Sequence, residues 1–216
     1  MPMFPLGGVL LPGMFLPLRV FEMRYRALMN TVIHDQEAPE FGVVMIERGF
    51  EVGGGDVRSM VGTVADVLQA AELPNGQLRV QALGMHRIRV NHWLPDDPYP
   101  VAEIERWEDP APGPELESLH HTMMGKLRRS LALASELGQG TVPATVELSD
   151  DLLIAGYQAA GIAPLGPLDK FNLLCAPSPE ARVRTLAELL DDASEMLAFR
   201  LGGDLDDDLG NDPTDG

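Results

Sequence analysis

The chain has 216 residues, a formal net charge of −17 and 45% hydrophobic residues. That hydrophobic share is typical of a folded globular protein and argues against disorder of the whole chain. Acidic residues outnumber basic ones in every section, so we do not expect a long basic face for nucleic acid or for an anionic membrane. Cys175 is the one cysteine, which excludes an internal disulfide and fits the reducing cytoplasm. We therefore predict a cytoplasmic globular protein that binds neither nucleic acid nor membrane.

Residues 1–18 contain no charged side chain, a property that signal peptides and membrane anchors share. They also contain four prolines and three glycines, which break the helix that either segment needs. The positive amino-terminal region of a signal peptide is missing too. We interpret this stretch as the buried start of the fold.

Short strands dominate the sequence up to residue 105. Apolar runs and alternating apolar residues predict strands over residues 14–20, 41–47, 60–70, 78–82, 87–91 and 99–105. Pro17 cannot donate to a neighbouring strand, so the first strand is expected at an edge or a bulge. Arg79, Arg87 and Arg89 are expected as solvated charges on the outer face of the sheet, or as a small basic patch there. The glycines at 53–55 indicate a hairpin tip.

One helix is predicted among the strands, over residues 21–29. Its apolar residues fall on one side, so it should cover one opening or face of the sheet. These residues are Phe21, Tyr25, Leu28 and Met29. Gly62 and Gly84 are expected to permit a close approach of backbone segments or a bulge.

The segment Asp109-Pro110-Ala111-Pro112-Gly113-Pro114 marks the clearest internal boundary. Beyond it, apolar residues spaced by three or four predict a helix over 116–137, and Ser149-Asp150-Asp151 can cap the next one. Further helices are expected over 167–175 and from 178 onward. The predicted organisation is a β-rich unit over 1–109, a helical bundle over 115–201 and a disordered acidic tail over 202–216.

The sequence contains no recognised catalytic or metal-binding motif. Neither Lys126 nor Lys170 follows the glycine-rich loop of an ATPase, and the nucleophile elbow of a serine hydrolase is missing. The histidines lack cysteine partners, and the adjacent pair His120-His121 is expected on a helix surface with both side chains partly exposed. Cys175 is expected to be a small buried apolar side chain. We therefore predict no catalytic residue, no cofactor and no metal.

Several segments near the amino terminus follow one another in a specific order. They are FPL at 4–6, VLLPGM at 9–14, LPL at 16–18 and FExRY at 21–25, followed by FGVV at 41–44, VGT at 61–63 and GQL at 76–78. In this order they resemble the amino-terminal, substrate-binding domain family of Lon proteases. The resemblance covers residues 1–201; its opening motif is specific, whereas its helical half is generic.

The resemblance implies an α+β fold, with a PUA-like β-pseudobarrel followed by a C-terminal α-helical bundle. It also implies recognition of client proteins or exposed apolar peptide segments, with a protease or chaperone as a further partner. Because the sequence stops before any ATPase or peptidase segment, we expect a stand-alone, non-enzymatic module. The alternatives are a small hydrolase or ligand-binding protein that uses the barrel–bundle cleft and, by analogy with the PUA fold, RNA binding.

Exposed apolar residues near helix and strand ends suit an adaptable peptide-binding surface. Met14, Phe15 and Met85 are the candidates for such a surface, although Met14 and Phe15 fit a core position equally well. The motif residues Phe21 and Tyr25 are instead expected to anchor the helix.

Overall fold

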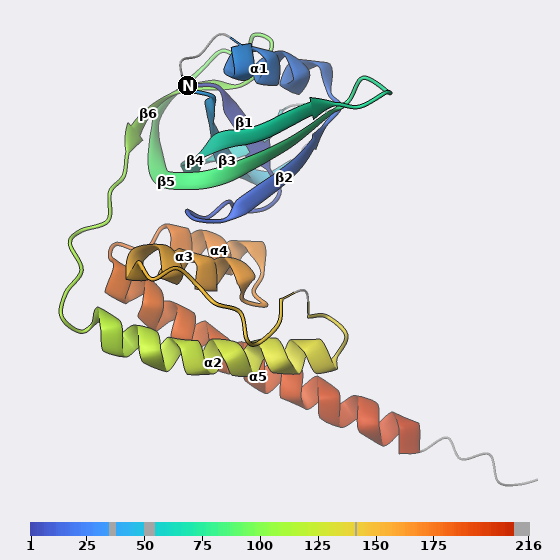
Figure 1. Ribbon diagram of the computed structural model, residues 1–216, viewed down its shortest axis with the longest axis vertical. Coiled ribbons are helices and arrows are strands. Elements are labelled where there is room, and N and C mark those ends of the chain that lie inside the picture. Colours follow the sequence, from blue (N-terminus) through green and yellow to red (C-terminus); the bar gives the residue numbers. More distant parts are fainter. Residues whose placement is uncertain (35–37, 50–54, 141, 210–216) are drawn as a thin grey trace, which may run out of the picture.

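The structure, a computed structural model, describes residues 1–34, 38–49, 55–140 and 142–209, without the side chains of residues 203–209. The strands of its six-stranded sheet are β1 (Met3–Leu6), β2 (Phe15–Val20), β3 (Glu40–Arg48), β4 (Val57–Glu72), β5 (Leu78–Leu94) and β6 (Val101–Arg106). The helices are α1 (Met23–His34), α2 (Leu116–Glu136), α3 (Leu152–Ile162), α4 (Pro167–Leu174) and α5 (Pro179–Leu209). The strands and α1 form an upper unit, and α2 to α5 form a bundle below it (Figure 1).

The sheet closes into a small barrel because its last strand returns to the amino terminus. β1 pairs with β3 in parallel, and β3, β4, β5 and β6 follow as antiparallel neighbours. Met3 N then donates to Pro100 O over 2.8 Å, and Ala102 N donates to Met1 O over 3.0 Å. The backbone hydrogen bonds of β6 therefore reach the start of β1.

β2 lies outside this closed path, beside the first half of β5. Within the described part of the chain β2 pairs with β5 alone, so the edge position predicted from Pro17 is confirmed. Gly84 N donates to Met14 O over 2.9 Å. Since backbone bonds alternate along an antiparallel pair, the ring nitrogen of Pro17 lies on the free edge, where no partner strand needs a donor.

Gly62 and Gly84 lie where two backbone segments approach too closely for a side chain. A Cβ atom at Gly62 would overlap the carbonyl oxygen of Val43, and one at Gly84 would lie 2.5 Å from the carbonyl oxygen of Leu11. The close approach predicted at both glycines is confirmed.

α1 covers the end of the barrel that is farthest from the bundle (Figure 1). Tyr25, Leu28 and Met29 are buried, and the Tyr25 ring stacks on Phe4 with centroids 4.3 Å apart. Burial raises the pKa of Tyr25 to about 12. The anchoring role predicted for Phe21 is wrong, because Phe21 precedes the first turn of α1 and is 54% exposed.

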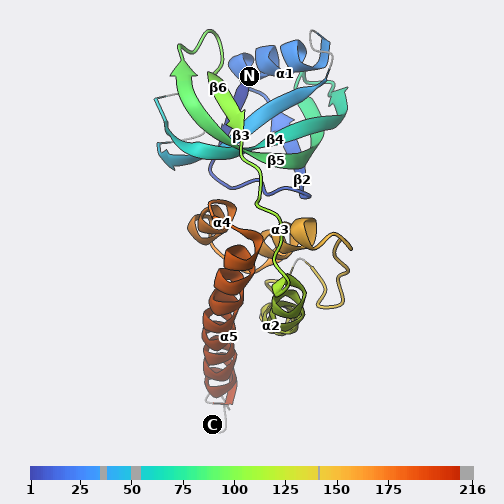
Figure 2. The ribbon, with the colours of Figure 1, turned by 90° about the vertical axis from the view of Figure 1, so that its left-hand side faces the viewer.

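In the bundle, α2 and α5 pack along each other, and α3 and α4 lie between this pair and the barrel (Figures 1 and 2). Leu127 of α2 and Leu190 of α5 are fully buried in the apolar core. Ser130 Oγ and Ser194 Oγ form a hydrogen bond of 2.9 Å within the same contact. Asp151 caps α3, as predicted, because its side chain accepts a hydrogen bond from the backbone of that helix.

Other parts of the chain differ from the sequence-based expectation. β1 was expected only as part of a buried start, and Cys175 is half-buried instead of fully buried. α5 continues to Leu209, beyond residue 202 where a disordered tail was expected to begin. Residues 210–216, like positions 53 and 54 of the predicted hairpin tip, lie outside the described residues.

Among the described residues, no helix is long and apolar enough to cross a membrane.

We expect Gly62→Ala to lower the free energy of unfolding by about 1 to 3 kcal/mol, because the added methyl group meets a backbone carbonyl that cannot move without shifting a strand. Urea denaturation measures this change. Gly125→Ala is the matched control, since nothing lies within 4 Å of a Cβ atom added at that exposed position of α2. The control should raise stability by up to about 1 kcal/mol. A Gly62→Ala variant as stable as the wild type would contradict the close-contact explanation.

Candidate functional site

The barrel and the bundle are joined through the side chain of Asp109, which follows β6. Its Oδ1 atom accepts hydrogen bonds from Arg87 Nη2 and Arg182 Nη2, each over 2.7 Å. Its Oδ2 atom accepts one from Tyr157 Oη, also over 2.7 Å. Arg87 belongs to β5, Tyr157 to α3 and Arg182 to α5. We call these four residues the Asp109 clamp, because one carboxylate connects the sheet with two helices.

Both arginines of the clamp are buried, with exposed fractions of 2% for Arg87 and 1% for Arg182. Arg87 Nη1 donates to the carbonyl oxygens of Leu174 and Ala176 over 2.7 and 2.8 Å, at the C-terminal end of α4 where the helix dipole favours a cation. The Arg182 guanidinium lies over the Tyr157 ring, with Cζ 3.6 Å from the ring centroid. The prediction of Arg87 as a solvated charge is wrong, because the bundle covers that side of the barrel.

The clamp is a cluster of titratable side chains, which is the feature that a hydrolase in the barrel–bundle cleft would need. Its chemistry does not suit that role. Burial raises the pKa of Tyr157, so the phenol stays protonated near neutral pH and cannot act as a base. Burial also lowers the pKa of Arg87, but a guanidinium stays charged in proteins. Both carboxylate oxygens of Asp109 are already engaged in hydrogen bonds to the other residues of the clamp. The role of the clamp is therefore to hold the barrel and the bundle together.

The other candidate nucleophiles also have structural roles. Burial raises the pKa of Cys175, so the unreactive thiol predominates near neutral pH. Lys170 Nζ donates to the Gly161 carbonyl oxygen over 2.6 Å between α3 and α4. Lys126 forms an ion pair of 2.6 Å with Asp191 between α2 and α5. These lysines therefore connect helices of the bundle.

A groove follows the side of the molecule next to the clamp. Its first hollow, of about 240 Å³, lies between the barrel and α3 and is lined by Met85, Trp107 and Ile154 among others. A second hollow, of about 410 Å³, shares Asp151 and Leu153 with the first.

The second hollow leads in turn to a third. This one has a volume of about 390 Å³, lies beside α2, and shares Glu117 and Leu152 with the second. Because neighbouring hollows share lining residues, they lie next to one another in a row from Met85 on β5 to Met124 on α2. We call this row the barrel–bundle groove.

One of the three residues predicted for peptide binding lies at the barrel end of this groove. Met85 lines the first hollow and is 41% exposed. Phe15 is 62% exposed and pairs with Leu83 of β5, but it does not line any of the three hollows. Met14 instead packs against α3, where a Cβ atom on Gly161 would lie 2.8 Å from its thioether sulfur. Peptide binding by Met14, Phe15 and Met85 stays a prediction.

Most of the groove comes from residues that carry no motif. Leu152, Leu153 and Ile154 appear in the sequence only as apolar residues after a helix cap, and residues 112–114 only as a boundary. The sequence contained one indication of a hollow at this place. A proline-rich segment between two folded units has to cross their contact, and it cannot fill the space there as a helix or a strand. A hollow beside it was therefore a reasonable expectation.

His120 lines the third hollow and differs from the partly exposed position predicted for it. It is 7% exposed, and its Nε2 atom has no hydrogen-bond partner among the described residues. Burial without an acceptor disfavours the charged imidazolium and lowers the pKa of His120.

Replacing Asp109 by Asn removes the charge that two buried arginines share. We expect Asp109→Asn to lower the free energy of unfolding by about 3 kcal/mol in urea denaturation. Asp150→Asn, at an exposed position, is the control and should change stability by less than about 0.5 kcal/mol. In a double-mutant cycle with Arg182→Met the two losses should not add, because both variants break the same clamp. Additive losses would contradict the clamp.

Acid should destabilise the fold through His120. Its folded-state pKa lies below the ordinary value of 6.5. The unfolded chain therefore binds the proton more readily, and the contribution to stability is lost as the pH falls below about 6.5. Between about pH 7.5 and about pH 5, we expect His120→Leu to lose less stability than the wild type in urea denaturation. His121→Leu, at the exposed neighbouring position, should lose as much as the wild type. Equal losses in all three proteins would show that His120 is not responsible.

Comparison with known proteins agrees with this architecture. A Lon protease of Brevibacillus choshinensis is 26% identical over 202 residues, which cover 91% of this chain and 25% of that protease. A crystal structure of a Lon N-terminal domain protein from Xanthomonas campestris is 27% identical, with a TM-score of 0.60, and the match covers 86% of this chain and 95% of that one. The N-terminal domain of a Mycobacterium avium complex Lon protease shares the fold, with a TM-score of 0.67 at 18% identity, over 88% of this chain and 97% of that one.

These likenesses confirm the predicted α+β class, with a barrel followed by a helical bundle. The chain spans about a quarter of the length of the Lon proteases that it matches. Residues 1–192 match the family model of the substrate-binding domain of ATP-dependent protease La (LON). The chain therefore belongs to the LON substrate-binding domain family, as its opening motif predicts.

Proposed function

We propose that the chain binds exposed apolar segments of other polypeptides in the barrel–bundle groove and catalyses no reaction on them. The row of adjoining hollows is the observation that carries this proposal, because neighbouring hollows share lining residues from β5 to α2. Small-molecule sites usually enclose most of their ligand. An open, elongated groove suits an extended segment of a chain instead.

The side chains at the two ends of the groove support an apolar ligand. Met85 lines one end and Met124 the other. Methionine is unbranched and polarisable, so it adapts to side chains of different shape. Phe15, which pairs with Leu83 of the same strand as Met85, adds a large exposed aromatic surface, and exposed apolar surface of this kind often marks a contact with another protein. Together these residues suit clients of varied sequence.

Membership of the family supports the proposal of polypeptide binding, because the family is described as a substrate-binding domain. The described residues offer no group that suits peptide-bond cleavage. We propose that a protease or a chaperone acts on the bound clients. The single cysteine is compatible with the cytoplasm as the place of this activity.

Met85→Ser tests the groove directly. The probe is a fluorescently labelled protein that is reduced and carboxymethylated and therefore stays unfolded. We expect its dissociation constant, measured by fluorescence anisotropy, to rise about threefold to tenfold, because a methionine contact is worth roughly 1 kcal/mol. Phe15→Ser should act in the same direction.

Leu168→Ser is the matched control. Leu168 lies on α4, is 64% exposed and does not line the groove. It should leave the dissociation constant unchanged. An equal loss in both variants would indicate nonspecific apolar contact, and unchanged binding by Met85→Ser would overturn the proposed site.

A further inference from the structure

We infer that the barrel–bundle groove selects segments in which a lysine or arginine lies between apolar residues, an inference that rests on the proposed function. The middle hollow carries it. Its lining includes apolar residues such as Pro114, Leu116 and Leu153, and two acids, Glu117 and Asp151. No basic side chain is among the described residues that line it. The hollow therefore joins an apolar floor to a negative rim.

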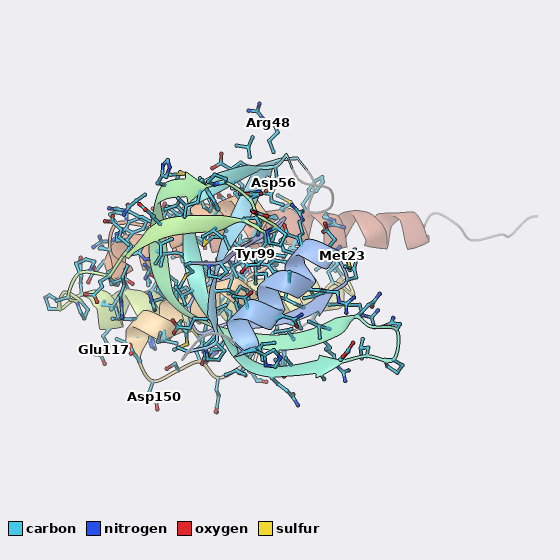
Figure 3. All side chains as sticks on the ribbon, turned by 90° about the horizontal axis from the view of Figure 1, so that it is seen from above. Met23, Arg48, Asp56, Tyr99, Glu117 and Asp150 are labelled. Atoms are coloured by element: carbon cyan, nitrogen blue, oxygen red, sulfur yellow. The ribbon has the colours of Figure 1, made fainter. Side chains whose placement is uncertain are left out.

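The carboxylates at this rim are available to a ligand. Glu117 lines the middle hollow, and Asp150 precedes the lining residue Asp151. Both are exposed, and within the described ranges neither has an ion-pair partner. In the view of Figure 3 both side chains project outward on the same side of the molecule. Asp151 differs, because its Oδ1 atom accepts a hydrogen bond of 2.9 Å from Leu153 N and caps α3. Glu117 and Asp150 are thus the acids whose charge α3 does not need.

A long basic side chain fits this combination of surfaces. The methylene stem of a lysine or arginine packs on apolar groups while its charged end reaches outward to water or to a carboxylate. In the middle hollow the stem would lie on Leu153 and Pro114, and the cation would face Glu117. An acidic side chain in the same position would meet repulsion from the rim. The residues before and after it would lie over the methionine-lined ends of the groove.

The two arginines that line the first hollow do not cancel this preference, because each already has a partner. Arg87 pairs with Asp109, and Arg106 forms an ion pair of 3.2 Å with Glu108. The formal charge of −17 also attracts a cationic segment over a longer range. Salt screens that long-range part beyond roughly 10 Å. The local contribution of the rim can therefore be separated from the net charge by experiment.

The test uses two fluorescently labelled peptides with the same apolar residues, one with lysine and one with glutamate at the central positions. We expect fluorescence anisotropy to show about tenfold tighter binding of the lysine peptide at low salt, from two weak exposed charge interactions that add. In the Glu117→Gln, Asp150→Asn double variant, the preference should fall below about threefold. Both substitutions leave the α3 cap intact.

The matched control is Asp192→Asn with Glu195→Gln, which removes the same two charges from exposed positions on α5. This variant should keep the preference of the wild type. An equal reduction in both double variants would overturn the rim as its source. If both peptides bind equally and binding still depends on Met85, the selectivity is wrong while the proposed function stands. If neither peptide nor the unfolded protein binds, both are wrong.

Discussion

The arrangement of the whole molecule depends on one buried carboxylate. Asp109 lies between two arginines that are almost completely removed from water, and moving such charges from water costs several kcal/mol each unless they are paired. Its hydrogen bonds, with those from Arg87 to the end of α4 and from Arg182 Nε to Leu173 O, pair both cations, although Arg87 Nε has no hydrogen-bond partner among the described residues. Because Arg87 belongs to β5 and Arg182 to α5, the barrel can dock on the bundle in few orientations. The first hollow of the groove exists only in the docked arrangement, since Met85 comes from one unit and Ile154 from the other.

Local structure could be predicted from the sequence where a local rule decides it. Pro17 indicates an edge strand, and apolar spacing gives the helices of the bundle. The errors have a common cause. On β5 the alternation separates Arg87 from Ile88 and Val90, which lie in the apolar core of the barrel, but the bundle covers the face of the strand that carries Arg87. His120 is buried for the same reason, on a helix that packs against others. Periodicity identifies the faces of one element, and it does not show whether a second layer covers them.

The candidate site could be predicted only in part, because it is formed between units. Met85 was found from its residue type, and it lines the barrel end of the groove. Asp109 was recognised only as the start of a proline-rich boundary, since its partners lie up to 73 residues away in the chain. The Tyr157 phenol, held protonated by burial, explains why titratable groups gather here without forming a reactive site. The Asp109 clamp and the first hollow of the groove therefore both lie where the barrel meets the bundle.

The most direct test of the groove is a methyl NMR titration, since the chain has 11 methionines. With methionine methyl groups labelled, an unfolded polypeptide is added to the intact protein. Binding in the groove predicts shifts of the methyl signals of Met85 and Met124, which line the two ends of the groove. It predicts no shifts at Met23 and Met196, which are 78% and 64% exposed and do not line the groove. Shifts at Met23 or Met196 without shifts at Met85 and Met124 would contradict it.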